Sequence, residues 1–417
     1  MAEKNIELIA YSTDASMIPG NAFSVIFPKS SQEISQIVRN SAGITIRGGG
    51  SGLVGGAVPQ NCVVIDLSKM NRVLEFDRKK VTIEVEAGIL LDELNDYLAR
   101  YSLEFPVQPS SHAIATIGGM IATNAVGSRA IKYGRTSNWL ESLEVVNGKG
   151  EILKIGKADL SDFCGMEGIT GVMVKAKLKL VNKKKRTANL LELTSLQEVS
   201  DSVTRFKLEK NVSAIEFIDK FTSGLIGMSD KYHLIIEFES DEGKLAGREY
   251  EKIMELRDSI YPSLASAGYS RIEDPKVMIN RFPEFAEFLE HEKIPYFGHL
   301  GVGIIHPCFR QDDKEKISEM IKFVKKLHGQ VSGEHGIGLA KKEFLEPSDI
   351  KLIERIKKRN DPLNKLNCGK VIDVKNEVIV NSKENNENAE KKLNESAGGI
   401  NNVDGTELNN GEEVKDE

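Results

Sequence analysis

The stretch Thr45–Pro59 reads TIRGGGSGLVGGAVP and places six glycines within the nine residues from Gly48 to Gly56. A short run of strand-forming residues leads into it, and glycine lets a backbone approach a ligand closely and adopt positive φ. Successive exposed N–H groups in such a loop form a concave anion site that suits a pyrophosphate. Neither the Walker A pattern nor a helix opened by GxGxxG follows. The loop alone therefore leaves phosphate binding and a flexible turn equally open.

Two more loops and several short elements surround this stretch. Phe105–Gly134 reads FPVQPSSHAIATIGGMIATNAVGSRAIKYG, and Cys164–Val174 reads CGMEGITGVMV. Apolar periodicity predicts one helix after Ser30 and Ser31, which are cap candidates, and another after Gly88. The expected strands are Cys62–Leu67, Val81–Glu86 and Leu143–Val146, and the first helix is Gln32–Arg39. Alternating strands, helices and glycine-rich turns predict a mixed α/β domain over residues 1–182.

The basic run Asn182–Thr187 (NKKKRT) is interpreted as a solvated domain junction, with a nucleic-acid patch as the alternative. Beyond it the pattern changes to the strands Ala214–Ile218 and His233–Phe238 and to charged helices such as Lys244–Arg257. This change predicts a second, α+β domain over residues 188–372.

Composition excludes several classes of protein. Residues 381–417 contain 9 Asn, 10 acidic and 4 basic residues, which predicts a disordered acidic tail and accounts for the whole net charge of −6. The balanced remainder argues against nucleic acid as the main partner. No run approaches the roughly 18 apolar residues of a membrane span. The N-terminus lacks a secretory signal, and the 4 cysteines show no CxxC spacing. These features predict a cytoplasmic protein without a zinc ribbon or its own cysteine-bound iron–sulfur cluster.

The three loops together resemble a known family. Arg-Gly-Gly-Gly-Ser-Gly, then Pro-Ser-Ser with Thr-Ile-Gly-Gly and Ala-Thr-Asn-Ala, then Gly-Met-Glu-Gly occur in that order. This order resembles the FAD domain of vanillyl-alcohol-oxidase-type flavoproteins. It is most similar to FAD-linked 2-hydroxyacid dehydrogenases: glycolate oxidase catalytic subunits, D-lactate dehydrogenases and D-2-hydroxyglutarate dehydrogenase. The resemblance covers nearly all of residues 11–372. It implies an α+β protein with a PCMH-type FAD-binding domain, followed by an FAD-linked oxidase C-terminal domain with an antiparallel sheet.

The resemblance also implies which residues hold FAD. The first loop would bind the pyrophosphate, the second would line the ribityl chain and the isoalloxazine ring, and the third would contact the adenosine side or the flavin edge. Ser51 stands where relatives with covalent FAD carry a histidine, which implies non-covalent FAD, and His112 is interpreted as a hydrogen-bonding loop residue. The implied residues are Arg47, Gly48, Gly49, Gly50, Ser51, Gly52, Pro109, Ser110, Thr116, Gly118, Gly119, Thr123, Asn124, Glu167, Gly168 and Val172.

Two histidine motifs lie in the second domain. His299 and His306 occur in FGHLGVGIIHP, and Glu334 and His335 occur in SGEHGIG. Two histidines and a glutamate are ligands that a divalent ion accepts, although isolated histidines are more often packing or surface residues. The resemblance implies that His299, His306 and Glu334 bind a divalent metal, zinc or manganese, and that His335 is the catalytic base. His233, His291 and His328 fall outside the motifs and are interpreted as surface or packing residues.

A carboxylate substrate needs a cation, and Arg257 matches the family's substrate arginine; a charge on a surface helix is the alternative. The chain departs from the family motifs where polar residues are expected. A family lysine falls near Ile272, beside Arg271, and Cys308 is interpreted as a buried thiol, with a metal contact as the alternative. The departures are Val302, Ile304, Cys308 and Ile272.

The resemblance implies FAD-dependent oxidation of a small D-2-hydroxyacid to the 2-oxoacid. Electrons would pass to a separate acceptor, either a protein, a quinone or another carrier. An iron–sulfur partner subunit or a second copy of the chain would fit this scheme, as would a peripheral place at the inner membrane face. Two alternatives stay open: another oxidoreductase of the same flavin fold, and a non-catalytic FAD-binding subunit of a multi-chain oxidase.

Overall fold

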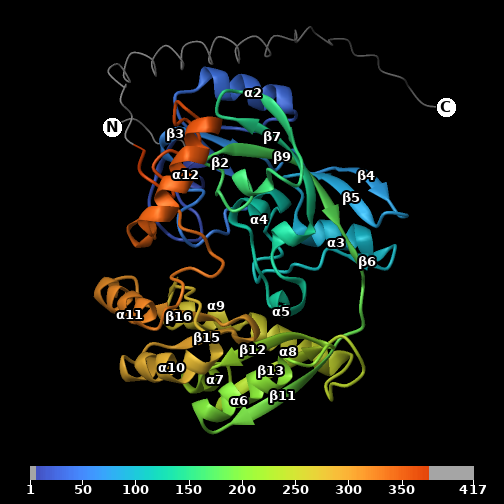
Figure 1. Cartoon of the computed structure of the whole chain (residues 1–417), viewed down its shortest axis with the longest axis vertical. Coiled ribbons are helices and arrows are strands. Elements are labelled where there is room, and N and C mark those ends of the chain that lie inside the picture. The colour runs from blue at the N-terminus through green and yellow to red at the C-terminus, as the bar shows by residue number, and fades with distance from the viewer. Residues whose placement is uncertain (1–5, 375–417) are drawn as a thin grey trace, which may run out of the picture.

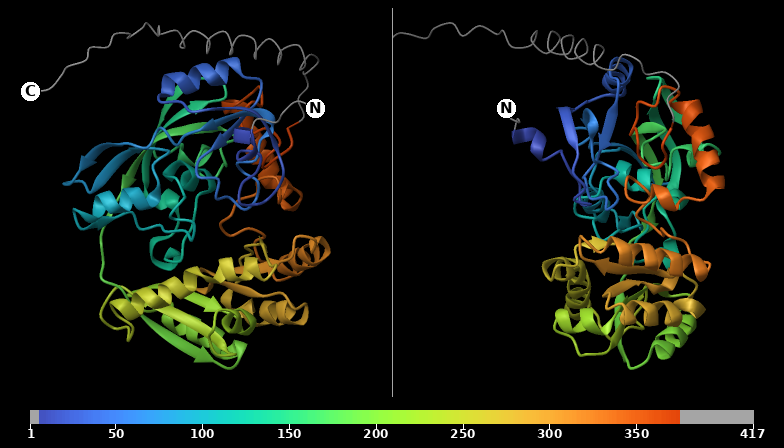
Figure 2. Two further views of the ribbon diagram at one scale, coloured as in Figure 1. Left: turned by 180° about the vertical axis from the view of Figure 1, so that it is seen from behind. Right: turned by 90° about the vertical axis from the view of Figure 1, so that its left-hand side faces the viewer.

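The computed structural model describes residues 6–374, and the expected tail, residues 381–417, lies outside them. The described chain forms two parts, one above the other in Figure 1. The upper part holds the first two sheets and the C-terminal helix α12, and the lower part holds a single larger sheet with its helices. The segment after β9 runs down one side from the upper part to the lower, as Figure 1 and the left view of Figure 2 show.

The first sheet of the upper part is parallel and has the order β1-β3-β2. Its strands are β1 (Asn21–Ile26), β3 (Gln60–Asp66) and β2 (Ile44–Arg47), and helix α2 (Ser31–Asn40) connects β1 to β2. Ser30 caps α2, because its side chain accepts a hydrogen bond from the amide of Glu33. The glycine loop follows β2 directly, so the parallel sheet fixes where that loop begins.

The second sheet of the upper part is antiparallel, with the order β4-β5-β9-β7-β8. One apolar core joins it to α3 and α4 and to the parallel sheet. The elements are β4 (Val73–Asp77), β5 (Thr82–Glu86), β7 (Leu140–Asn147), β8 (Ile152–Ile155), β9 (Gly171–Lys179), α3 (Leu91–Ala99) and α4 (Ile117–Thr123). A short pair, β6 (Leu103–Glu104) and β10 (Val181–Asn182), extends the rim.

The lower part is a six-stranded antiparallel sheet with helices on both faces (Figure 1). In order the strands are β11 (Thr187–Leu193), β13 (Tyr232–Phe238), β12 (Val212–Ile218), β15 (Tyr296–His299), β16 (Ile304–Phe309) and β14 (Arg271–Ile272). Helices α6 (Leu196–Phe206), α10 (Phe282–His291) and α11 (Lys314–Lys326) pack into one core. Helices α8 (Arg248–Asp258) and α9 (Ile260–Ser266), with the segment after α7 (Lys220–Leu225), pack into a second core.

The chain returns to the upper part at its C-terminal end. Helix α12 (Pro347–Asn360) lies beside the first sheets in Figure 1, and the Ile44 amide donates to the Lys365 carbonyl at 2.8 Å. The division into a domain over 1–182 and a domain over 188–372 remains a proposal. The returning helix contacts the first of these domains although it lies within the residue range of the second. The remaining helical turns are α1 (Ile6–Ile9), α5 (Ala130–Tyr133), η1 (Thr136–Trp139), η2 (Leu160–Asp162), η3 (Ile279–Arg281), η4 (Leu300–Val302) and η5 (Lys342–Phe344).

The expected elements are confirmed in type, with small shifts at their ends. The predicted strands correspond to β3, β5, β7, β12 and β13, and the predicted helices to α2, α3 and α8. Helix α8 begins at Arg248 rather than at Lys244, because glycine at position 247 has φ +53° and precedes the helix. Within the basic run Asn182–Thr187, the Arg186 guanidinium pairs with Glu104 and is buried.

Buried charges join the two parts. Arg129, just before α5, donates to both carboxylate oxygens of Glu237 on β13, at 2.8 and 3.0 Å. Both side chains are 10% exposed or less. Tyr133 also donates to Glu239 at 2.5 Å. These contacts anchor α5 of the upper part against the sheet of the lower part.

Candidate flavin and metal site

The glycine loop presents free backbone donors. Within the described chain, none of the backbone amides of residues 48–53 donates to a protein acceptor. Gly49 allows the loop to lie directly on the second loop, because a Cβ at this position would sit 1.7 Å from the Ile114 carbonyl oxygen. Gly50 adopts φ +68°, in the left-handed region. A run of unpaired donors on a loop that needs glycine fits a pyrophosphate.

The Arg47 side chain packs against the glycine loop, because a Cβ at Gly50 would lie 2.5 Å from its Nη2. Its guanidinium donates to the Thr13 carbonyl at 2.7 Å and lies 5.3 Å from the centre of the Tyr11 ring. The N-terminal segment covers the loop from this side, since Ala15 donates its amide to the Gly50 carbonyl at 3.0 Å. The Arg47 charge therefore lies beside the main-chain donors of the loop.

The second loop ends in a capped helix. Thr116 caps α4 by accepting from the Gly119 amide at 3.1 Å, and Thr123 donates to the Gly119 carbonyl at 3.2 Å. Asn124 ends the helix in the left-handed conformation, with φ +50°. Gly118 packs against Ala87, the residue that follows β5, because a Cβ at Gly118 would lie 2.8 Å from the Ala87 Cβ. The expected flavin residues of this loop thus form one compact surface next to the glycine loop.

The third loop directs its glutamate towards the segment that follows His335. Glu167 has φ +47°, and its carboxylate accepts from the amides of Ile337 at 2.6 Å and Gly338 at 2.9 Å. Burial raises the pKa of Glu167 to about 7. Gly168 has φ +73°, and the Val172 side chain lies fully inside the core. The third loop therefore holds the segment that follows the Ser-Gly-Glu-His motif.

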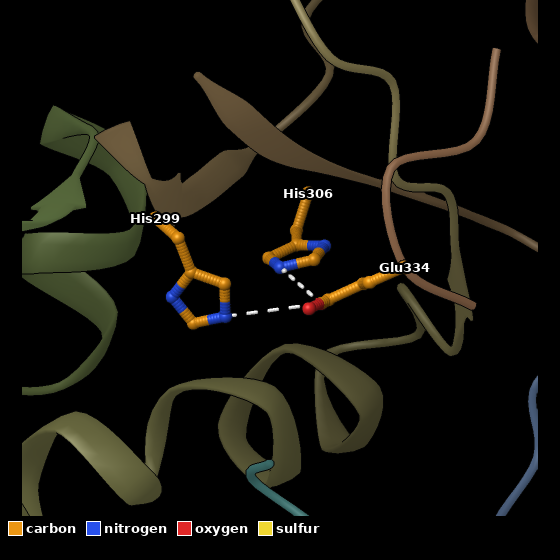
Figure 3. A group of neighbouring side chains, drawn as sticks. All are labelled: His299, His306 and Glu334. Carbon is orange, nitrogen blue, oxygen red and sulfur yellow. Dashed lines mark ion pairs between the residues drawn. The ribbon is translucent and has the colours of Figure 1, made fainter. Parts of the chain in front are cut away.

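Two histidines and a glutamate converge in the lower part (Figure 3). Glu334 Oε1 lies 3.1 Å from His306 Nε2 and 3.7 Å from His299 Nε2. One ligand atom from each of the three residues lies within 4.8 Å of the others. His299 ends β15 and His306 lies on β16, so one strand pair positions both rings. The donor set and its spacing fit a divalent ion.

A buried carboxylate orients the first histidine. Glu216 on β12 accepts from His299 Nδ1 at 2.7 Å and from Arg257 Nε at 2.8 Å. Burial raises the pKa of Glu216, but the charges of His299 and Arg257 outweigh burial and bring this pKa to about 2. Because Nδ1 of His299 is bound to Glu216, its Nε2 is left to face Glu334.

Arg257 is buried, with 6% of its surface exposed, and is therefore not a surface charge. Its Nη1 donates to Ser110 of the second loop at 2.9 Å and to Asp258 at 2.9 Å. Its other contacts go to Glu216. Arg257 thus connects the Pro-Ser-Ser loop of the upper part with the histidine cluster of the lower part.

His335 lies against the same cluster. Its ring stacks on His306 with centroids 5.3 Å apart, and its Nε2 lies 3.4 Å from Glu334 Oε1. On the other side, Nδ1 lies 3.7 Å from Asp274 Oδ1. Burial lowers the pKa of His335, but the charges of Asp274 and Glu334 outweigh burial and leave this pKa above its ordinary value.

The residues that depart from the family motifs lie in apolar surroundings. Ile304 is 1% exposed and packs under the turn Ser332–His335, where its Cγ1 would lie 2.8 Å from a Cβ on Gly333. Cys308 donates to the His306 carbonyl at 3.5 Å, and burial raises its thiol pKa well above the ordinary value. Ile272 pairs with Cys308 across the sheet, and Val302 belongs to the turn η4. Cys308 is not part of the His299–His306–Glu334 group.

The other histidines do not join the cluster. His233 is 1% exposed and lies between Ser223 and Ser229, and His291 sits on the surface beside Glu292. His112 lies 2.8 Å from Asp92 and so makes the hydrogen bond expected of it. His112, His233 and His291 therefore lie outside the cluster of His299, His306 and His335.

The glycine loop is hydrogen-bonded to the segment that follows His335. The Leu339 amide donates to the Val54 carbonyl at 2.7 Å, and Gly338 leaves room for Val54, whose carbonyl oxygen would lie 2.2 Å from a Cβ at that glycine. Arg135 of the upper part donates to the Gly333 carbonyl at 3.0 Å. The candidate dinucleotide loop and the His335 segment are consequently adjacent, as a flavin oxidation site requires.

Three carboxylate contacts were not predictable from the sequence motifs: those of Glu216 and Asp274, and that of Glu167 with the segment after His335. Asp274 lies two residues after β14 and directly before Pro275, where no local pattern marks it as the acceptor of three amides. Glu216 is a charged residue inside an otherwise apolar strand, and a buried charge of that kind requires a partner.

Comparisons with known proteins agree with this geometry. The model for an FAD binding domain matches residues 23–156, and the model for the C-terminal domain of FAD linked oxidases matches residues 246–371. D-lactate dehydrogenase of Archaeoglobus fulgidus is 30% identical, covering 84% of this chain and 91% of that protein. D-2-hydroxyglutarate dehydrogenase of Stutzerimonas stutzeri is 27% identical, covering 84% and 90%. The glycolate oxidase subunit GlcD of Bacillus subtilis is 28% identical, covering 88% and 93%.

A solved structure shares the fold. Alkyldihydroxyacetonephosphate synthase superposes with a TM-score of 0.63 at 17% identity, over 87% of this chain and 81% of that one. The shared fold, together with the two family models, confirms the expected vanillyl-alcohol-oxidase-type fold. Among residues 6–374, no helix is long and apolar enough to cross a membrane. With both domain models matched in order and a 30% identical relative along most of its length, the chain belongs to the FAD-linked 2-hydroxyacid dehydrogenase family and is an FAD-dependent oxidoreductase.

Proposed function

We propose that the protein oxidises a D-2-hydroxyacid to the corresponding 2-oxoacid. The substrate gives a hydride from Cα to FAD and a proton from its hydroxyl group to His335. One observation carries the proposal: His299, His306, Glu334 and His335 converge on one point, and the segment after His335 is hydrogen-bonded to Val54, the residue that follows the free amides. The D configuration is supported by the relatives that are named D-lactate and D-2-hydroxyglutarate dehydrogenase.

The three loops would hold FAD without a covalent bond. The amides of residues 48–53 would bind the pyrophosphate, while the second loop, with Pro109, Ser110 and Thr116, would line the ring system. Ser51 offers no ring nitrogen for attachment. Bound FAD supplies the oxidant, which accepts the hydride at its N5 position. The protein contributes the close main-chain contacts that fix the ring relative to His335.

His299, His306 and Glu334 would hold a divalent ion. Both Nε2 atoms face Glu334, and Glu216 occupies Nδ1 of His299, as metal-binding histidines require. Such an ion, zinc or manganese by its ligand set, supplies a Lewis acid that lowers the hydroxyl pKa.

The chain's own side chains would orient the substrate and take its proton. His335 Nε2 faces the cluster and would accept the hydroxyl proton. Arg257 Nη1 is the guanidinium nitrogen that contacts Ser110 and Asp258 rather than Glu216, so it would exchange Ser110 for the substrate carboxylate. The Cα hydrogen would then point towards the flavin.

The reduced flavin must pass its electrons to a separate acceptor. No CxxC pair or other cysteine cluster occurs in the sequence. We therefore expect the acceptor to be a partner protein with an iron–sulfur centre, a quinone or another diffusible carrier. A homo-oligomer of this chain is compatible with each of these acceptors.

Anaerobic addition of D- and L-hydroxyacids to the purified yellow protein tests the function. We include lactate, glycolate and 2-hydroxyglutarate, and we expect D-acids to bleach the flavin. His335→Ala should retain FAD but slow bleaching by about 100-fold or more, since a positioned base contributes about that factor. Bleaching of the variant at the rate of the wild type would remove His335 from its role. Absence of bleaching by every acid would instead favour a non-catalytic FAD-binding subunit.

A further inference from the structure

Asp274 holds the turn that carries two of the proposed site residues. It is fully buried, and its Oδ2 accepts from three consecutive amides: Gly333 at 2.9 Å, Glu334 at 2.6 Å and His335 at 2.7 Å. The Ser332 hydroxyl donates to the same oxygen at 3.0 Å. Four donors that converge on one carboxylate oxygen fix the backbone of the motif rather than merely adding a contact to it.

The charge of Asp274 is secured from the opposite side. Its Oδ1 pairs with Lys341, which is 1% exposed and also lies 3.0 Å from Glu273. Because the cation and the four donors stabilise the ionised form, the carboxylate remains an acceptor while it is buried.

Asp274 also faces the ring of His335. Nδ1 of His335 lies 3.7 Å from Asp274 Oδ1 and makes no hydrogen bond within residues 6–374. The other ring nitrogen, Nε2, lies 3.4 Å from Glu334 Oε1, so the ring is held between two carboxylates. Asp274 thus lies beside both the backbone of the turn and the ring that the turn carries.

We propose that Asp274 is a positioning residue for the oxidation. It fixes the Ser332–His335 turn through three amides, and so holds the Glu334 side chain and the His335 ring against His299 and His306. The part that concerns His335 as a base rests on the proposed function, whereas the part that concerns the turn does not.

Hydrogen–deuterium exchange of Asp274→Asn tests the hold on the turn. The asparagine amide would face backbone donors, so exchange across residues 332–338 should be at least about tenfold faster than in the wild type. Asp361→Asn is the matched control, since Asp361 is a buried carboxylate that accepts from Lys357, Lys365 and Leu366 elsewhere in the chain. It should leave exchange of the turn unchanged.

The rate of anaerobic bleaching per bound flavin, at saturating acid, tests the catalytic part. Asp274→Asn should lower this limiting rate by about 10- to 100-fold, as the loss of charge-assisted hydrogen bonds predicts. Asp361→Asn should keep the wild-type rate.

Two results would overturn the inference: unchanged exchange of the turn, or a wild-type bleaching rate in Asp274→Asn. If Asp274→Asn does not fold, Asp274→Glu serves the same tests, since it keeps the charge near Lys341 but displaces the accepting oxygen. If the wild type is not bleached by any acid, the proposed function fails, and the exchange measurement alone decides whether Asp274 holds the turn.

Discussion

Glu216 shows how one residue determines the chemistry of two others. Its two oxygens bind His299 Nδ1 and Arg257 Nε, and the residue is 3% exposed. In Glu216→Gln, the amide group can donate to Nδ1, which places the ring proton on Nε2, where the metal would bind. We expect divalent-ion affinity to fall about 10- to 100-fold, as measured by titration calorimetry. Unchanged affinity would show that Glu216 does not set the His299 tautomer.

Gly49 tests the dinucleotide loop at the scale of one methyl group. In Gly49→Ala the new Cβ would lie 1.7 Å from the Ile114 carbonyl oxygen, so the loop must move. We expect the purified variant to lose most of its flavin while its far-ultraviolet circular dichroism is retained. Gly156→Ala is the control, because no atom lies within 4 Å of its Cβ position. Full flavin content in Gly49→Ala would contradict the assignment of this loop.

The residues of the site differ in how far the sequence predicts them. The sequence predicts a ligand where a motif is contiguous and its residue types suit one kind of ligand. This holds for Gly48–Gly52 and for the motifs that contain His299, His306 and Glu334. Glu216 and Asp274 act through contacts with residues 83 and 61 positions away, which only the folded sheet brings together. The direction of the Glu167 carboxylate likewise depends on its φ of +47°.

At the scale of an element, the cap of helix α7 is pH-dependent. Asp219 accepts from the Thr222 amide at 2.9 Å, and burial raises its pKa to about 7, with Glu290 adding to the rise. Because the folded state holds this proton more tightly than the unfolded state, the unfolding free energy falls as pH rises from about 4 to about 7. Above pH 7 this loss is complete.

Asp219→Asn keeps a side-chain acceptor for the α7 cap without a buried charge. We expect its unfolding free energy at pH 8 to exceed that of the wild type by roughly 1–4 kcal/mol, and the difference to disappear near pH 4. Urea unfolding at both pH values measures this. A variant that is less stable than the wild type at pH 8 would show that the charge of Asp219 stabilises the cap.

Element boundaries were predicted well where local chemistry defines them. Ser30 caps α2 as its residue type suggests, and β12 and β13 lie where the β-branched runs occur. The order of the sheet was not predictable, because β14 joins the edge beyond β16 through only two paired residues. The return of α12 to the first sheets was not predictable, since the contacts that place it there, such as the Gly148 amide on the Asn360 carbonyl at 2.9 Å, join residues far apart in the sequence.

At the scale of the whole molecule, buried ion pairs hold the two parts in register. Arg129 and Glu237 pair across the junction with both side chains at or below 10% exposure. Arg129→Ala leaves Glu237 buried with Arg186 Nε, 3.9 Å away, as its remaining cation. Breaking a buried pair costs up to about 3–5 kcal/mol. We expect a lower midpoint in urea unfolding. A midpoint equal to that of the wild type would show that the pair adds nothing to the junction.

The central claim is that the free amides of residues 48–53 hold a flavin whose ring faces His335. A crystal structure of the protein with FAD, measured as the distance from flavin N5 to His335 Nε2, tests it most directly. We predict about 7 Å, which leaves room for one small acid with a contact of ~3.5 Å on each side. A ring bound elsewhere, with His299, His306 and His335 remote from it, would contradict the account.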